Sequence, residues 1–286
     1  MIVDFRVNTP NARGIQVYID PPEFAQGYVD TYRSIFGEKV KEYLMSPKQF
    51  LEFMDHEGVD VAVFSAGDNE STMGRKYPNE EMAEFVQQNP KRFIGLAGAD
   101  PHKGMKAVKE LEHAIARLGL KGLNIGPWMQ KIHANDKKYY PLYAKCMELN
   151  IPVVIHTSIN FLRHVSMDLG RPIYLDEVAM DFPDLKIIAS HGGWPWVPEL
   201  IAVCWRHPNV FVEIAAIRPK YIGAPGTGWE TLLQYGNTLL QDRVLFATDW
   251  PMLPMRRSIE EVKALPLKEE VKKKWLGDNA AQLLGL

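Results

Sequence analysis

Short apolar segments recur along the chain, and a helical pattern follows most of them. Eight such segments can be distinguished, and most of them are continuously apolar rather than alternating, as strands are when both faces of a parallel sheet are covered. Because helical patterns separate them, we expect βαβ units and a parallel sheet. The eight expected strands are Ile2–Phe5, Asp60–Ser65, Phe93–Gly98, Lys121–Ile125, Ile151–His156, Leu185–Ser190, Asn209–Ile214 and Arg243–Thr248.

Proline and glycine residues near their ends support the helical segments. These segments are Pro78–Gln88, His102–Leu118, Tyr140–Leu149, Leu175–Phe182 and Trp196–Arg206. Eight strands in this alternation predict an α/β fold, a single (β/α)8 barrel of the TIM type that forms one domain over residues 1–286. The alternative is an open doubly wound sheet, but no GxGxxG motif follows an early strand.

The segment Pro10–Leu51 is long and has no clear periodicity. A connection of this length is typically a functional loop or a lid. Since it follows the first strand, we expect a long loop on the active-site side of the barrel.

Length and charge narrow the function classes. The 286 residues carry a net charge of −2, which gives no electrostatic case for nucleic acid or an anionic membrane as partner. The two cysteines, Cys146 and Cys204, form no CxxC pair, and the sequence shows neither a signal peptide nor a membrane span. We therefore expect a cytoplasmic protein with a small-molecule partner, and a homo-oligomer is left open.

Polar side chains stand at the ends of several expected strands. Arg6 and Asn8 follow the first, His156 ends the fifth, His191 follows the sixth and Asp249 follows the eighth, while Glu213 lies near the end of the seventh. In a barrel of this type the carboxyl ends of all strands meet at one rim, where catalytic groups gather. A structural histidine, or Asp249 as a helix cap, is the alternative at each single position.

Several motifs resemble the amidohydrolase-2 (amidohydrolase-related) family, which includes aminocarboxymuconate-semialdehyde and resorcylate decarboxylases. The matching segments are Val3-Asp4-Phe5, Gly122-Leu123-Asn124-Ile125, Val154-Ile155-His156, Ser190-His191-Gly192-Gly193-Trp194-Pro195-Trp196, Phe246-Ala247-Thr248-Asp249-Trp250-Pro251 and Asn279-Ala280-Ala281. The resemblance implies a (β/α)8 barrel, and it implies that His156 and Asp249 are metal ligands and that His191 transfers a proton.

The first strand departs from this family. Its members usually carry an HxH or ExH pair of metal ligands where this chain has Arg6-Val7-Asn8. Arginine has no lone pair to offer a metal. We therefore expect that no cofactor is required, with one divalent metal, zinc before others, as the alternative, held by His156 and Asp249.

Three functions remain open. The first is a hydrolase of an ester, lactone or C–C bond in a small carboxylated, aromatic-derived substrate. In it Asp249 activates water, His191 or His156 donates a proton, and Arg6, Asn8 and Trp194 bind the substrate. The second is a non-oxidative decarboxylase of an aromatic or dienoic acid, with Asp249 or His191 as the proton donor. The third is a catalytically inactive binding barrel.

Overall fold

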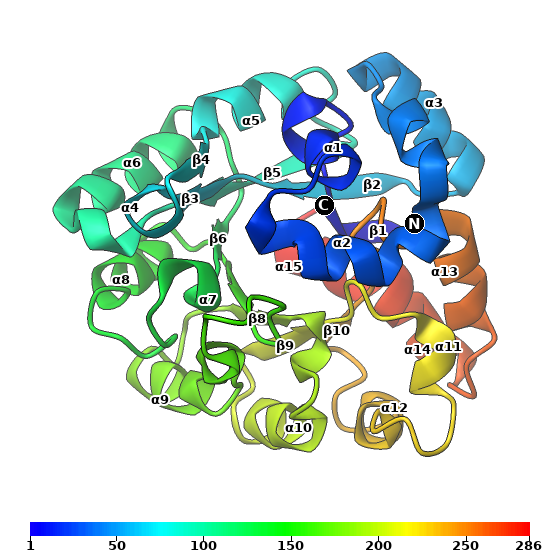
Figure 1. The fold of residues 1–286 in the computed structure, drawn as a ribbon. Helices are drawn as coiled ribbons and strands as arrows, with labels where there is room; N and C mark the ends of the chain where they lie inside the picture. The colour runs from blue at the N-terminus through cyan, green and yellow to red at the C-terminus, as the bar shows by residue number, and fades with distance from the viewer.

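Eight parallel strands surround a central axis in the computed structural model (Figure 1), which describes residues 1–286 apart from the side chains of Phe24 and Glu38. They pair in the order β1-β2-β5-β6-β7-β8-β9-β10. Their bounds are β1 (Val3–Val7), β2 (Val61–Ser65), β5 (Phe93–Gly98), β6 (Leu123–Ile125), β7 (Val153–His156), β8 (Ile187–Ser190), β9 (Val210–Glu213) and β10 (Val244–Leu245).

Backbone contacts between β1 and the segment after β10 close the barrel. The Phe5 amide donates to the Phe246 carbonyl at 2.9 Å, and Val7 forms a parallel bridge with Trp250. The predicted TIM-type barrel is confirmed, and the alternative of an open sheet is wrong. That residues 1–286 are a single domain stays a prediction.

An irregularity in β1 turns the side chains at the end of this strand toward the barrel interior. Asp4 pairs with Ala62 of β2, but the next pair is Val7 with Phe64, so β1 advances three residues while β2 advances two. An extra residue of this kind reverses the side-chain alternation beyond it. Val7 then shares the outer layer with Phe64, and Arg6 and Asn8 turn inward. Regular alternation would have placed both on the side of Asp4.

The connection after β1 is long, as predicted, but most of it is helical. It contains α1 (Ala12–Ile19), α2 (Glu23–Phe36), a short 3-10 helix (Gly37–Tyr43) and the start of α3 (Pro47–Glu57). The Asn11 side chain caps α1, and apolar residues at helical spacing are buried beneath α2. Helices α1 and α2 lie across the end of the barrel in Figure 1. The expected loop is therefore a helical cover.

The structure contains a hairpin after β2 that was not predicted from the sequence. Strands β3 (Gly67–Asn69) and β4 (Arg75–Tyr77) pair antiparallel, with α4 (Glu70–Met73) between them. Strands of three residues are too short to leave a periodic signal. The hairpin lies beside the barrel mouth, near α4 and β6 in Figure 1.

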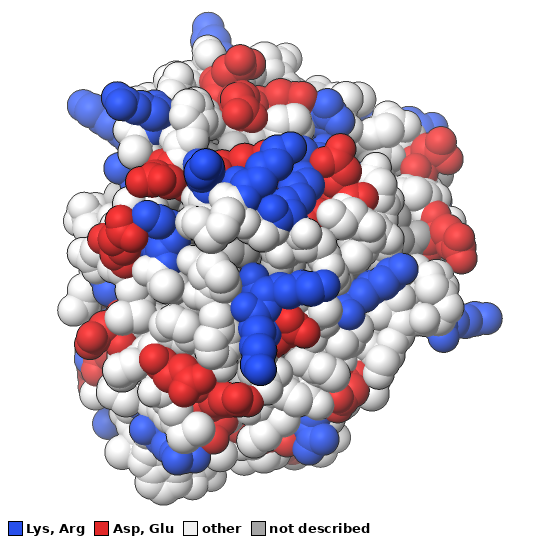
Figure 2. Space-filling model, turned by 90° about the vertical axis from the view of Figure 1, so that its left-hand side faces the viewer, with Lys and Arg blue, Asp and Glu red and all other residues white. Residues whose placement is uncertain are grey.

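The remaining helices lie around the barrel, and Ala280 and Leu283 of the last one pack with the inward-facing residues of the strands. These helices are α5 (Asn79–Val86), α6 (Met105–Ala116), α7 (Pro127–Gln130), α8 (Tyr140–Glu148), α9 (Tyr174–Asp181), α10 (Val197–Arg206), α11 (Pro219–Ile222), α12 (Glu230–Gly236), α13 (Met255–Lys263), α14 (Glu269–Lys273) and α15 (Asn279–Leu284). Among the described residues, none of the helices combines the length and apolar character that crossing a membrane requires. On the face shown in Figure 2, basic and acidic side chains are interspersed.

Candidate active site

Arg6 lies inside the barrel mouth and is held by two side chains from other strands. Its Nε donates to both carboxylate oxygens of Glu213 at 3.2 and 3.1 Å, and its Nη2 donates to Asn124 Oδ1 at 3.3 Å. The Arg6 side chain is 16% exposed and Glu213 is fully buried. A guanidinium has five N–H donors, so three remain for a ligand.

Buried charges shift the pKa values around Arg6. Burial raises the pKa of Glu213 to about 7, although the charge of Arg6 opposes the shift. Burial alone would lower the pKa of Arg6, but Glu213 and Asp249 raise it. The guanidinium therefore stays charged, while the carboxyl beside it can hold a proton near neutral pH.

Asp249 faces the same space from the segment after β10. Its backbone φ is 55°, in the left-handed region that residues with a side chain seldom adopt, and its amide donates to the Arg6 carbonyl at 2.9 Å. The Asn8 amide donates to Asp249 Oδ1 at 3.0 Å and also lies 3.0 Å from the Tyr18 hydroxyl. Burial raises the pKa of Asp249, opposed by the charge of Arg6 and the hydrogen bond from Asn8.

The two predicted histidines lie side by side, with ring centroids 4.7 Å apart. Burial and the charge of Arg6 lower the pKa of His156 to about 3. Burial, the neighbouring imidazole and Arg6 lower the pKa of His191 well below its usual value. His191 Nδ1 lies 3.2 Å from the Ala215 carbonyl, which can only accept, so Nδ1 carries the proton. Both rings are therefore neutral at physiological pH.

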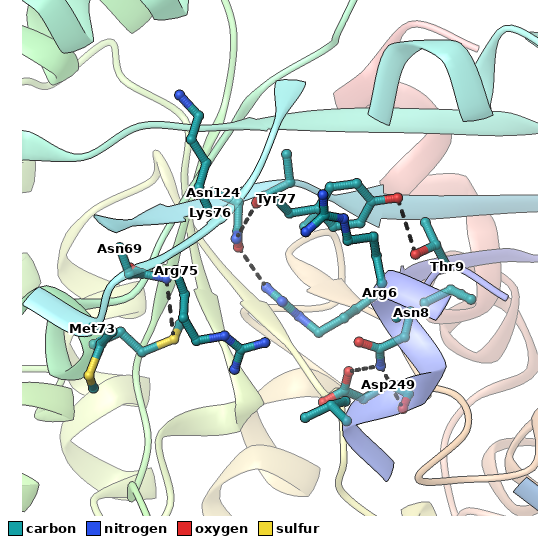
Figure 3. Close-up of a pocket in the computed structure, with 18 of the residues that line it drawn as sticks. Arg6, Asn8, Thr9, Asn69, Met73, Arg75, Lys76, Tyr77, Asn124 and Asp249 are labelled. Carbon is teal, nitrogen blue, oxygen red and sulfur yellow. Dashed lines mark hydrogen bonds between the residues drawn. The ribbon is translucent and has the colours of Figure 1, made fainter. Parts of the chain in front are cut away.

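A cavity of about 470 Å³ opens at this end of the barrel, within the range of roughly 300–1,000 Å³ for small-molecule sites. Arg6, Asn8 and Asp249 all line it, as Figure 3 shows. Residues from far apart in the chain thus reach one cavity. Its wall does not include His156, His191 or Trp194. Trp194 is 37% exposed and stacks on Trp229 at 5.5 Å. The roles of these three residues stay predictions.

Comparison with known proteins identifies the family. The family model described as amidohydrolase matches residues 32–286. The chain belongs to the amidohydrolase family. This amidohydrolase is 25% identical to the 2-amino-3-carboxymuconate-6-semialdehyde decarboxylase of Dictyostelium discoideum, over 88% of this chain and 80% of that protein. It is 23% identical to a gamma-resorcylate decarboxylase of Rhodococcus jostii, over 73% of this chain and 75% of that protein.

Solved structures share the barrel of this amidohydrolase. An uncharacterised TIM-barrel protein of Bordetella bronchiseptica superposes with a TM-score of 0.82 and 28% identity, covering 99% of this chain and 98% of that one. The 5-carboxyvanillate decarboxylase of Novosphingobium aromaticivorans, crystallised with manganese, gives 0.73 and 18% identity over 100% and 96%. At 18% identity the second likeness shows the fold alone.

The donor set of this amidohydrolase does not fit a divalent metal. Among the described residues, no group of three or more His, Cys, Asp or Glu side chains is arranged to hold a metal ion. His156 Nδ1 is buried without a hydrogen-bond partner and could donate or accept, but the charge of Arg6 acts on both imidazoles. A cation close to the ligands opposes a second cation.

Three neighbours of the predicted site lie outside the sequence prediction. From the sequence, Glu213 is expected near the end of the seventh strand, but no role is assigned to it. Asn124 is named only as part of a family motif. The register of the strands that carry them brings both side chains into hydrogen-bonding distance of Arg6. Arg75 lines the cavity from the β3–β4 hairpin. Because that hairpin leaves no sequence signal, Arg75 could not have been found from the pattern.

Proposed function

We propose that this amidohydrolase is a non-oxidative carboxy-lyase that releases CO₂ from a small aromatic or dienoic acid. One observation carries the proposal: a guanidinium and a protonatable carboxyl, Arg6 and Asp249, face one cavity. The decarboxylase relatives support it. The predicted hydrolase finds no such support.

The raised pKa of Asp249 favours decarboxylation over hydrolysis. A hydrolase would use the carboxylate form to activate water, whereas a decarboxylase needs the acid form to donate a proton. Burial raises the pKa of Asp249, which shifts this carboxyl toward its acid form relative to an exposed aspartate. The neutral His156 and His191 lack the extra proton of an imidazolium. We therefore assign proton donation to Asp249 and hydrogen bonding to the histidines.

In the proposed reaction, the N–H groups of Arg6 that remain available bind the substrate carboxylate through two parallel hydrogen bonds. The Asp249 carboxyl transfers its proton to the carbon that bears this carboxylate. The C–C bond to the carboxylate then breaks, its electron pair returns to the conjugated system, and CO₂ leaves. Asp249 ends as a carboxylate and regains a proton from water. No oxidant or reductant takes part.

Product analysis in labelled water tests this proposal. The purified enzyme is incubated with hydroxybenzoates, carboxylated hydroxybenzoates and dienoic acids in D₂O, and separately with lactones in H₂¹⁸O. We expect one CO₂ and one carbon-bound deuterium per turnover, and no solvent ¹⁸O in the product. Incorporation of ¹⁸O without CO₂ would restore the hydrolase, and no turnover of any acid would favour the inactive binding barrel.

The Arg6→Met variant tests the guanidinium. We expect kcat/KM to fall by about 10²–10³-fold, as for other preorganised charge-stabilising donors. Because this change leaves Glu213 buried without its partner, the double variant Arg6→Met/Glu213→Gln separates loss of function from loss of folding. Arg206→Met serves as the control, since the exposed Arg206 is held by Asp176 at 3.0 and 2.9 Å and does not line the cavity. Turnover intact in either Arg6 variant would refute this role.

A further inference from the structure

The segment after β9 forms a tight turn that contains a strained residue. The Ile217 amide donates to the Ile214 carbonyl at 3.3 Å, so Ala215 and Ala216 are the central residues of the turn. Ala216 has a φ of 58°, in the left-handed region that favours glycine. A residue with a side chain keeps this conformation only where its surroundings fix it. The contacts of the two alanines therefore bear on the role of the turn.

Ala215 contacts two side chains of the candidate site. Its carbonyl accepts from His191 Nδ1 at 3.2 Å, which fixes the tautomer of this imidazole and leaves Nε2 as a hydrogen-bond acceptor. Burial raises the pKa of Glu213, and a hydrogen bond from the backbone of Ala215 is among the contacts that oppose this rise. The orientation of Ala215 thus affects both His191 and the carboxyl that binds Arg6.

Tyr32 of the cover helix α2 holds the other end of the turn. Its hydroxyl donates to the Ala216 carbonyl at 2.8 Å, which joins residues 184 positions apart, and α2 lies close to the segment after β9 in Figure 1. Burial raises the pKa of Tyr32 to about 12, and the charge of Asp249 adds to the rise, so the phenol keeps the proton that it donates. Tyr32 is not among the described residues that line the cavity, so we expect it to make no direct contact with a ligand.

The geometry of neighbouring peptide groups connects these contacts. The Ala215 and Ala216 carbonyls belong to consecutive peptide planes, which are joined at the Cα atom of Ala216. The φ and ψ angles of Ala216 therefore set the orientation of one carbonyl relative to the other. Without the bond from Tyr32, Ala216 can relax to a negative φ, and the Ala215 carbonyl then turns away from His191.

Helix α2 is held by apolar packing as well as by Tyr32. Ala25 and Val29 are fully buried, and Phe36 packs edge-on against Tyr18 with ring centroids 5.6 Å apart. Loss of one hydroxyl should therefore leave the helix in place and release only the turn. The effect of the hydroxyl can then be measured separately from the folding of the cover.

We propose that Tyr32 is a positioning residue, whose hydrogen bond to the Ala216 carbonyl keeps the ring of His191 in the orientation and tautomer that the reaction uses. The inference rests on the proposed function, in which the histidines act as hydrogen-bonding groups. Because the bond comes from a cover helix and not from a strand, the seating of α2 over the barrel completes the orientation of His191.

Substitutions on either side of this bond test the assignment. Tyr32→Phe removes the hydroxyl and keeps the ring. Thr31→Val is the matched control, because the exposed Thr31 hydroxyl donates to the Gly27 carbonyl of its own helix at 2.8 Å. Ala216→Gly removes the strain, because glycine adopts a positive φ readily. The double variant Tyr32→Phe/Ala216→Gly completes a double-mutant cycle.

The first readout is the ¹⁵N NMR spectrum of the histidine side chains, which reports the tautomer of His191 without turnover. We expect Tyr32→Phe to introduce the second tautomer, or to speed exchange of the Nδ1 proton by about fivefold or more. The second readout is steady-state kinetics, in which kcat should fall by about 10-fold while KM changes by less than about threefold. In the Ala216→Gly background the same change should lower kcat by less than about threefold. Thr31→Val should match the wild type in both readouts.

The outcomes separate this inference from the proposed function. An unchanged kcat or an unchanged His191 signal in Tyr32→Phe would overturn the assignment. An equal loss of kcat with Ala216 and with Ala216→Gly would make Tyr32 a packing residue and would also overturn it. Thermal unfolding of each variant checks that it is folded. A His191 signal that depends on Tyr32, found in a protein that releases no CO₂ from any acid, would refute the carboxy-lyase while keeping the orientation of His191 by Tyr32.

Discussion

At the scale of single residues, two carboxyl groups share the charge of one guanidinium. Arg6 binds Glu213 directly and its charge also acts on Asp249. Burial raises the pKa of both carboxyls, and the negative charge of an ionised Asp249 raises the pKa of Glu213 further. One cation cannot neutralise two buried anions, which favours the acid form of each carboxyl, and the pKa of Glu213 reaches about 7. The proposed reaction consumes the proton of Asp249.

This sharing predicts the pH dependence of the reaction. We expect kcat/KM to fall as pH rises over the range in which the protein stays folded, because the acid form of Asp249 is lost above its raised pKa. The measurement is a pH–rate profile for the wild type, His156→Gln and His191→Gln. The histidine variants should keep the falling limb, since both imidazoles are already neutral. A rate that increases with pH over this range would argue for a carboxylate base.

At the scale of secondary-structure elements, β1 positions the site and closes the barrel. Its extra residue turns Arg6 and Asn8 inward, while Asp4 remains on the outer side and is fully buried. Asp4 accepts from the Thr248 amide at 2.9 Å and from Thr248 Oγ1 at 2.5 Å. These bonds tie the first strand to the segment that carries Asp249.

Breaking this link should destabilise the barrel. We expect Thr248→Val to lower the free energy of unfolding by about 1–3 kcal/mol, because it leaves a buried acceptor unsatisfied. Urea unfolding measures the change. Thr238→Val is the control, since its exposed hydroxyl bonds only carbonyls of its own helix end. A cost no larger than that of the control would contradict the role of the link.

The same link gives stability a pH dependence. Burial raises the pKa of Asp4 from 3.8 to about 7. Between these values the folded state binds a proton that the unfolded state has released, so the contribution of Asp4 to stability is lost as pH rises toward 7. Asp4→Asn should flatten this part of the wild-type slope, and parallel slopes for the two proteins would be the contrary result.

At the scale of the whole molecule, the barrel brings eight strand ends to one mouth, and the cover helices and hairpin complete it. Arg6 and Asn8 stand at the end of the first strand, where the resemblance described above led us to expect metal ligands. We infer that the guanidinium of Arg6 supplies the positive charge that a metal ion would otherwise bring. Catalysis by this protein should therefore be independent of added metal.

Chelation and elemental analysis test that independence. We expect turnover to survive dialysis against EDTA and not to rise when Zn²⁺ or Mn²⁺ is returned. The metal content of the same samples is measured in parallel by elemental analysis. About one metal ion per chain, with activity that follows its loss and return, would instead make His156 and Asp249 ligands and remove the proposed role of Arg6.

The amino-acid sequence by itself determined the barrel, the order of its strands and the members of the site that stand at strand ends. Arg6, Asn8 and Asp249 could be placed at one cavity because every parallel strand delivers its carboxyl end to the same rim. Continuous apolar runs carry this information locally. The helical cover over 10–51 was not predicted, although α2 has 14 residues and its buried Ala25, Val29 and Phe36 stand at helical spacing.

Only the tertiary structure decided which way the side chains face and what they meet. The extra residue in β1 depends on pairing with β2, so alternation within β1 alone would have turned Arg6 to the wrong side. The contacts of Arg6 with Glu213 and Asn124 join strands 207 and 118 residues apart. Arg75 reaches the cavity on a hairpin too short to be read from periodicity. Such contacts arise from register and closure, which no local pattern encodes.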